Sequence, residues 1–102
     1  MRQIITPVVF RRWKDTATII ALFPDSPADI NGWYCDSYER IGQHGGADYH
    51  GVIAHTVPAS QKESAPLTCE LVRIGYRLKV LQRASRHHHE HRRQTALQFS
   101  SA

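Results

Sequence analysis

The alternation of hydrophobic and polar residues predicts four or five strands and one helix. Alternation over a few residues is typical of a half-buried strand, whereas apolar residues three and four positions apart indicate a helix. The first expected strand is Gln3–Trp13, and it contains Pro7, which cannot donate to a ladder and therefore favours an edge or a strand start. A short polar connection leads to Ala17–Phe23, whose apolar run is typical of a central strand.

The third expected strand, Trp33–Ile41, opens the most distinctive stretch of the chain. Its alternation predicts a core face with Trp33, Cys35 and Ser37, and a solvated face with Tyr34, Asp36, Tyr38 and Arg40. If a helix covers the second face, its two tyrosines belong to the core instead. The following residues 44–51 are too rich in glycine for a regular element.

The second half of the chain predicts a short strand, a helix and a last strand. Val52–Val57 is the short strand. Ser60 and Glu63 have the spacing of a capping box, but a helix from there would contain Pro66 at a cost of about 3 kcal/mol. We therefore expect the helix to begin near Ser64 and to end at Ile74. Its buried stripe is Leu67, Leu71 and Ile74, with Leu71 packed in one core with Trp33, and Tyr76–Leu81 follows as a half-buried strand.

These elements predict an α+β fold, with one helix packed on a small antiparallel sheet of four to five strands, in a single domain over residues 1–82. Residues 83–102 lack apolar periodicity, so we expect a disordered basic tail there. The net charge of +4 is concentrated in the tail, which has four arginines against Glu90, whereas residues 1–82 have nine basic and eight acidic residues. The expected domain is therefore nearly neutral, which argues against a broad basic face.

Cysteine usage and hydropathy indicate a cytoplasmic protein with no membrane partner. Cys35 and Cys69 are the only cysteines and have neither a CxxC nor a metal-type spacing, so we expect free thiols. No secretory signal pattern is present. The longest apolar run, Ala17–Phe23, is far shorter than the roughly 20 residues of a membrane helix.

A metal or catalytic site is weakly indicated between Cys35 and His55. This segment carries several ligand types, namely Cys35, Asp36, His44, Asp48, His50 and His55. Their spacing matches no zinc signature, and loop hydrogen bonds are the simpler interpretation. We therefore expect no catalytic residue, metal or cofactor, and keep a small metal-dependent enzyme using this segment as the alternative function.

Two sets of residues are candidates for binding a macromolecule. Tyr34, Tyr38 and Arg40 form an aromatic and arginine surface, the composition of protein-binding hot spots and of stacking platforms for single strands. Arg86, Arg92 and Arg93 are clustered in the tail, where they would bind nucleic-acid phosphates by counterion release. The simpler interpretation of the tail is a solvated charge run, and its four close histidines are a loose metal chelator at most.

Several segments resemble a group of short, uncharacterised bacterial proteins, typically encoded on conjugative plasmids and integrative elements of proteobacteria. The segments are Ile20–Pro24, Gly32–Cys35, Ile41–Gly45, Ala47–Tyr49 and Ile74–Val80. The resemblance covers roughly residues 8–83, and Pro66 departs from it. It implies no activity, but it does imply a cytoplasmic accessory protein of a mobile element. We therefore expect a non-enzymatic protein that binds either a protein partner or nucleic acid.

Overall fold

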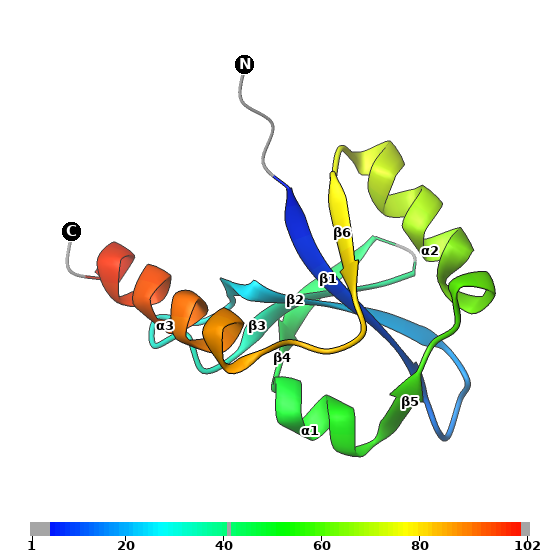
Figure 1. The fold of residues 1–102 in the computed structure, drawn as a ribbon, viewed down its shortest axis with the longest axis horizontal. Coiled ribbons are helices and arrows are strands. Elements are labelled where there is room, and N and C mark those ends of the chain that lie inside the picture. The colour runs from blue at the N-terminus through cyan, green and yellow to red at the C-terminus, as the bar shows by residue number, and fades with distance from the viewer. Residues whose placement is uncertain (1–4, 41, 101–102) are drawn as a thin grey trace.

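The computed structural model describes residues 5–40 and 42–100, which form six strands and three helices (Figure 1). The elements are β1 (Thr6–Trp13), β2 (Ile19–Pro27), β3 (Cys35–Glu39), β4 (Gln43–Ala47), α1 (Tyr49–Ala54), β5 (Thr56–Pro58), α2 (Gln61–Ile74), β6 (Leu78–Leu81) and α3 (Arg86–Ser100). The expected strand start at Gln3 and strand end at Ile41 lie outside the described residues.

All strands belong to one sheet, in which β1 has two different neighbours along one edge. Five strands follow the antiparallel order β4-β3-β2-β1-β5. β6 pairs with the first half of β1 in parallel, whereas β5 pairs with its last residues. The α+β class is confirmed, but the sheet has six strands and a parallel pair, and three helices accompany it.

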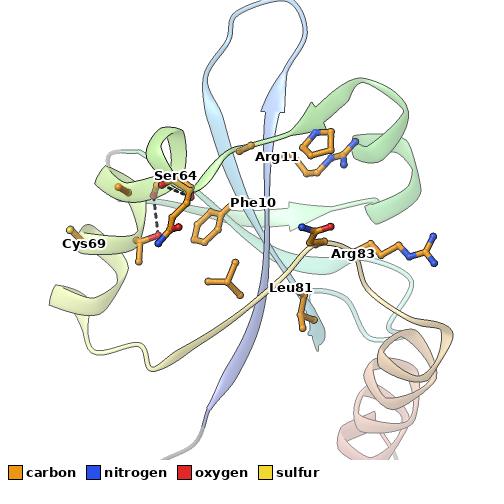
Figure 2. A pocket seen from close by; sticks show the side chains of 13 residues that line it. Phe10, Arg11, Ser64, Cys69, Leu81 and Arg83 are labelled. Carbon is orange, nitrogen blue, oxygen red and sulfur yellow. Dashed lines mark hydrogen bonds between the residues drawn. The ribbon is translucent and has the colours of Figure 1, made fainter.

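A cavity of about 780 Å³ opens where β5 and β6 separate along β1 (Figure 2). Phe10 of β1 and Leu81 of β6 line it together with Ser64 and Cys69 of α2. Arg11 also lines it, but its guanidinium is bound to Thr56, with Nε 2.9 Å from the side-chain oxygen and Nη2 3.0 Å from the carbonyl oxygen. Arg11 therefore holds β5 in place.

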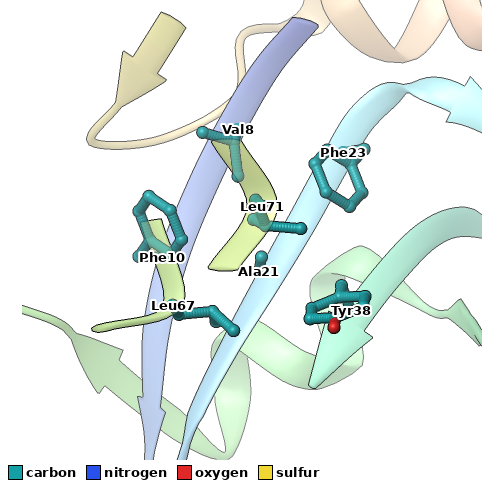
Figure 3. Close-up of a cluster of buried hydrophobic side chains, with 7 residues drawn as sticks. All are labelled: Val8, Phe10, Ala21, Phe23, Tyr38, Leu67 and Leu71. Atoms are coloured by element: carbon teal, nitrogen blue, oxygen red, sulfur yellow. The ribbon is translucent and has the colours of Figure 1, made fainter. Parts of the chain in front are cut away.

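Both faces of the sheet are buried, and each has its own hydrophobic core. On one face α2 contributes Leu67 and Leu71 to a cluster completed by Val8, Phe10, Ala21, Phe23 and Tyr38 (Figure 3). On the other face α1 contributes Tyr49 and Val52, and the remaining members are Val9, Ile20, Leu22, Cys35 and Ala47. Alternate residues of β1 and β2 therefore enter opposite cores, which explains their continuous apolar runs.

The assignment of faces to residues 33–38 is partly wrong. Cys35 and Ser37 are buried, as predicted. Tyr38, expected on a solvated face, is 1% exposed because α2 covers that side of the sheet. Trp33, expected in the core with Leu71, is 57% exposed. It precedes β3, so the inward and outward alternation of side chains in that strand does not apply to it.

The glycine-rich segment is more regular than expected. Residues 43–47 form β4, which pairs with β3 along its whole length. The expected strand Val52–Val57 is wrong, because Val52 and Ile53 belong to α1 and only Thr56–Pro58 form β5. Val52 packs in the core as a helical residue, and a short apolar run does not distinguish a strand from a buried helical turn.

Helix α2 begins at the capping box, so the expected start near Ser64 is wrong. The Glu63 amide donates to Ser60 Oγ at 3.1 Å, and the Ser60 amide donates to Glu63 Oε1 at 2.9 Å. These reciprocal bonds offset the one that Pro66 cannot make inside the helix. Leu67 and Leu71 are buried as predicted, whereas Ile74 is 51% exposed.

The expected disordered tail is instead helix α3 over residues 86–100, packed along β2. Arg92 and Ala96, four positions apart, are only 4% and 3% exposed. The buried face of α3 thus consists of one arginine and one alanine, and two such residues give no apolar periodicity from which a packed helix could be predicted. Residues 101–102 of the expected tail lie outside the described residues.

Candidate binding groove beside helix α3

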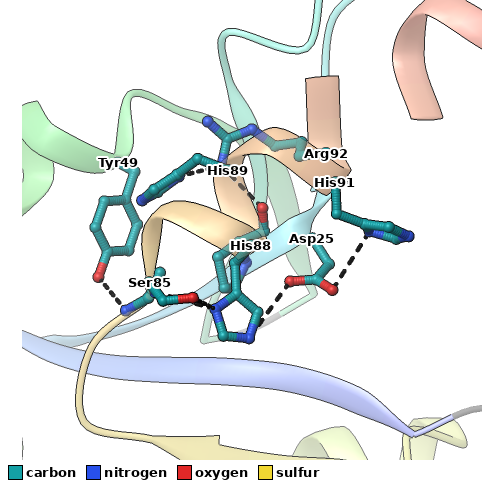
Figure 4. Close-up of polar contacts among 9 residues, drawn as sticks. Asp25, Tyr49, Ser85, His88, His89, His91 and Arg92 are labelled. Atoms are coloured by element: carbon teal, nitrogen blue, oxygen red, sulfur yellow. Dashed lines mark hydrogen bonds and ion pairs between the residues drawn. The ribbon is translucent and has the colours of Figure 1, made fainter. Parts of the chain in front are cut away.

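Arg92 attaches α3 to the sheet and to the loop that follows β2 (Figure 4). Its Nη1 donates to the carbonyl oxygen of Pro24 at 2.8 Å, and its Nε donates to the carbonyl oxygen of Gly32 at 2.9 Å. Both bonds are buried. A guanidinium has five donors in a rigid fork, so one side chain satisfies carbonyls from two segments.

The β1–β2 register relates the Pro24 carbonyl to Pro7. The pairing runs from Arg12 opposite Ile19 to Val9 opposite Leu22, and the same register continued by two residues would bring Pro7 opposite Pro24. Proline has no amide hydrogen, so in that register the Pro24 carbonyl would receive no ladder bond from Pro7. A buried carbonyl without a partner is costly, and Arg92 supplies the missing hydrogen bond.

Gly32 lets the loop lie directly on α3. Its φ is +73°, and a Cβ at this position would lie 2.8 Å from Cα of Arg93 and 3.0 Å from Cβ of Ala96. Any larger residue would therefore push the loop away from the helix. This contact places the next residue, Trp33, beside the exposed side of α3.

The first turn of α3 is held by a second polar cluster around Asp25 (Figure 4). His88 Nδ1 accepts from the Ser85 amide at 3.0 Å and lies 2.8 Å from Ser85 Oγ. The first contact is one of the two bonds of a capping box, with histidine in place of glutamate. His88 Nε2 and His91 Nδ1 lie 3.9 Å and 3.4 Å from the carboxylate oxygens of Asp25. These tail histidines thus face a carboxylate of β2.

The same cluster has the residue types of a hydrolytic triad but not its geometry. Ser85 contacts His88, and His88 is oriented towards Asp25. However, the distance of 3.9 Å from His88 Nε2 to Asp25 exceeds a hydrogen bond, and the Ser85 amide already binds the nitrogen that would act as base. We interpret the cluster as a helix cap.

A groove of about 730 Å³ lies between α3, α1 and the loop after β2. We call it the α3 groove and define it by Trp33, Tyr34, Tyr49, His50, His89 and Arg93. The Arg93 guanidinium carbon lies 3.9 Å from the centroid of the Trp33 ring, a cation–π contact between helix and loop. Trp33 and Tyr34 are still 57% and 50% exposed, so both rings are open to a partner.

Three rings stand close together in the groove. The centroid of His89 lies 4.7 Å from that of Tyr49 and 5.1 Å from that of His50. His89 Nδ1 lies 2.8 Å from Arg92 Nη1, and because arginine only donates, this nitrogen accepts and the ring hydrogen is on Nε2. Burial, and then the positive charge of Arg92, lower the pKa of His89, so its imidazole is neutral at pH 7.

Four of the six predicted binding residues line this groove, although they come from two separate sets. Tyr34, Arg86, Arg92 and Arg93 are brought together, whereas Tyr38 is buried under α2 and Arg40 is exposed elsewhere. Arg92 is a structural residue here, since its guanidinium is bound to buried carbonyls and not open to a phosphate. The sequence patterns do not predict Trp33, Tyr49, His50 and His89 as groove residues: Trp33 is expected in the core, and the two histidines only as candidate metal ligands. The Ser85–His88 spacing is the one signal for a helix start beside them.

The residues proposed for the alternative metal site are scattered. Cys35 is buried, and burial raises the pKa of its thiol to about 11. His44 packs against Tyr38, with 4.6 Å between ring centroids, and His55 Nδ1 lies 2.8 Å from the Gly51 carbonyl oxygen. Within residues 5–40 and 42–100, no group of three or more His, Cys, Asp or Glu side chains is placed to hold a metal ion.

Comparison of the chain with protein-family models, with curated proteins and with solved structures finds no match. Among the helices of the described residues, none has the length and apolar character to cross a membrane.

Proposed function

We propose that this chain is a non-enzymatic, cytoplasmic accessory protein of a bacterial mobile element, and that it binds a macromolecule in the α3 groove. The observation that carries the binding proposal is the stacking of Arg93 on Trp33, which joins an exposed aromatic loop to the basic helix. Tryptophan, tyrosine and arginine are the residue types enriched in binding hot spots. The mobile-element context is supported by the resemblance of segments such as Ile74–Val80.

Both a protein partner and nucleic acid fit the residue types of the groove. Exposed aromatic rings next to arginine anchor protein interfaces and also stack on bases. The alternative of a metal-dependent enzyme has weaker support, because Cys35 is a buried thiol and His55 binds a carbonyl of its own helix.

Affinity purification from cells tests this function. The full chain is compared with a Trp33→Ala/Arg93→Gln variant and with an Ile30→Ala/Arg73→Gln control. The control removes an exposed apolar residue from the same loop and an exposed arginine from α2, neither of which lines the groove. We expect one protein or nucleic-acid species to co-purify with the wild-type and control chains and not with the groove variant. Identical co-purifying molecules from all three chains would contradict the proposal.

A further inference from the structure

Two exposed arginines of the basic C-terminal segment, Arg86 and Arg93, border the α3 groove. Residues 83–102 carry four arginines against Glu90, and only Arg92 among these arginines is buried. The side chain of Arg86 is 93% exposed, and Arg83 and Arg93 are also exposed. Among the described residues, Arg93 has no acidic partner, so its guanidinium charge is free to meet an anion.

Acidic side chains reduce this charge only in part. Glu90 lies 3.1 Å from Arg86 in an exposed ion pair, which a competing anion displaces at little cost. Asp48 also lines the groove, at the start of α1. The charged side chains that line the groove sum to +1, with Arg86, Arg92 and Arg93 against Asp48 and Glu90, and this balance favours an anionic partner.

The groove offers two exposed rings and two hydrogen-bond donors. Trp33 has one face against Arg93 and remains 57% exposed, and Tyr34 follows it directly. Deeper in the groove, His89 Nε2 carries a hydrogen for which the described residues provide no acceptor. The hydroxyl of Tyr49 accepts from the Ala84 amide at 2.7 Å, which leaves its own hydrogen to donate.

From the charge, the rings and the donors together, we infer that the α3 groove binds single-stranded nucleic acid. Bases stack on Trp33 and Tyr34, phosphates lie along Arg86 and Arg93, and His89 donates to an acceptor that enters the groove. This inference rests on the proposed function and names its partner. A single strand fits better than a duplex, because paired bases are not free to stack on a protein ring.

Titration of labelled oligonucleotides with the full chain tests the inference. Single-stranded DNA and RNA of mixed sequence and a DNA duplex are used at two salt concentrations. We expect single strands to bind more tightly than the duplex, with a log–log salt slope of about −1.4 if Arg86 and Arg93 each release roughly 0.7 counterion. Trp33→Ala should weaken binding about 5- to 150-fold, the range for loss of one stacked base.

Arg93 is tested by two substitutions and a matched control. Arg93→Gln removes the charge and should weaken binding and reduce the salt slope, whereas Arg93→Lys keeps the charge and should retain the slope. Arg73→Gln, on the opposite face of the sheet, makes the same charge change and should leave more than half of the affinity. Thermal unfolding of each variant confirms that it is folded before its affinity is compared.

Two results would overturn the inference. One is the absence of single-strand binding by the wild-type chain at low salt. The other is binding that Trp33→Ala and Arg93→Gln leave unchanged. If a protein nevertheless co-purifies in a manner that depends on the groove, the proposed function stands and nucleic acid is rejected as its partner.

Discussion

Arg92 Nη1 donates a hydrogen bond of 2.8 Å to the carbonyl oxygen of Pro24, two residues beyond the last β1–β2 pair, Val9 opposite Leu22. A carbonyl of β2 is thus satisfied by a side chain from a helix 68 residues further along the chain. The second bond of Arg92, to Gly32, fixes the loop that carries Trp33. The groove exists because these bonds bring α3 and the loop together.

Removal of this side chain should destabilise the fold. Arg92→Ala leaves the carbonyls of Pro24 and Gly32 buried without a donor, and each costs about 1–3 kcal/mol, so we expect a loss of about 2–6 kcal/mol in the free energy of unfolding. Arg86→Ala, at a side chain 93% exposed, should change it by less than about 0.5 kcal/mol. Urea unfolding of both variants measures the difference, and equal effects would contradict the role of Arg92.

The relation between Arg92 and Pro7 predicts an energetic coupling. In the register continued from Val9 and Leu22, Pro7→Ala places an amide hydrogen opposite the Pro24 carbonyl. Arg92→Ala should therefore cost less in the Pro7→Ala background than in the wild-type chain, by about 0.5–1.5 kcal/mol, the net value of one hydrogen bond. A double-mutant cycle from urea unfolding gives this coupling. Additive effects of the two substitutions would show that Pro7 does not create the need for Arg92.

The two thiols should differ in reactivity. Cys35 is fully buried, and burial raises the pKa of its thiol to about 11, so thiolate is scarce at pH 8. Cys69 is exposed on α2. We expect a thiol reagent to modify one cysteine rapidly in the native chain and the second only on unfolding. Mass spectrometry after proteolysis should assign the rapid reaction to Cys69; rapid modification of Cys35 would contradict its burial.

Acid should weaken the fold through His89. Burial and Arg92 lower the pKa of this histidine in the folded state, so its contribution to stability is present above the unfolded value of 6.5 and is lost as the pH falls through the folded value. His88, His50 and Asp25 also act on its ring, so the change must be isolated by substitution.

His89→Asn keeps an acceptor for Arg92 and cannot titrate. The loss of unfolding free energy between pH 7 and 5 should therefore be smaller in His89→Asn than in the wild-type chain. His87→Asn, at an exposed neighbour, should behave like the wild-type chain. An identical pH dependence in all three chains would show that His89 does not titrate with folding.

The sequence predicted most of the sheet because its signals there are local. The apolar runs of β1 and β2, the burial of Cys35 and the packing of Leu67 and Leu71 all follow from side-chain periodicity. The predicted α2 start near Ser64 is wrong because the two bonds of the Ser60–Glu63 cap outweigh the cost of Pro66 inside the helix. The sequence contains both the Ser60–Glu63 capping box and Pro66, but which of them decides the helix start depends on how the helix packs on the sheet.

The groove could not be predicted because it depends on long-range contacts. α3 buries little apolar surface of its own, and its docking depends on Arg92 reaching a loop 60 residues away. Tyr34 and Arg93 were each identified as binding residues, but only the position of Gly32 against α3 makes them neighbours. No pattern within either segment encodes that contact.

The most direct test of this account is amide hydrogen exchange along α3, compared between the wild-type chain and Arg92→Ala. If Arg92 docks the helix, wild-type amides between Arg92 and Ala96 should exchange about two orders of magnitude slower than in an unstructured peptide. In Arg92→Ala this protection should be lost from α3 while the β1 and β2 amides stay protected. Unstructured exchange rates over residues 86–100 of the wild-type chain, or equal protection in both chains, would contradict it.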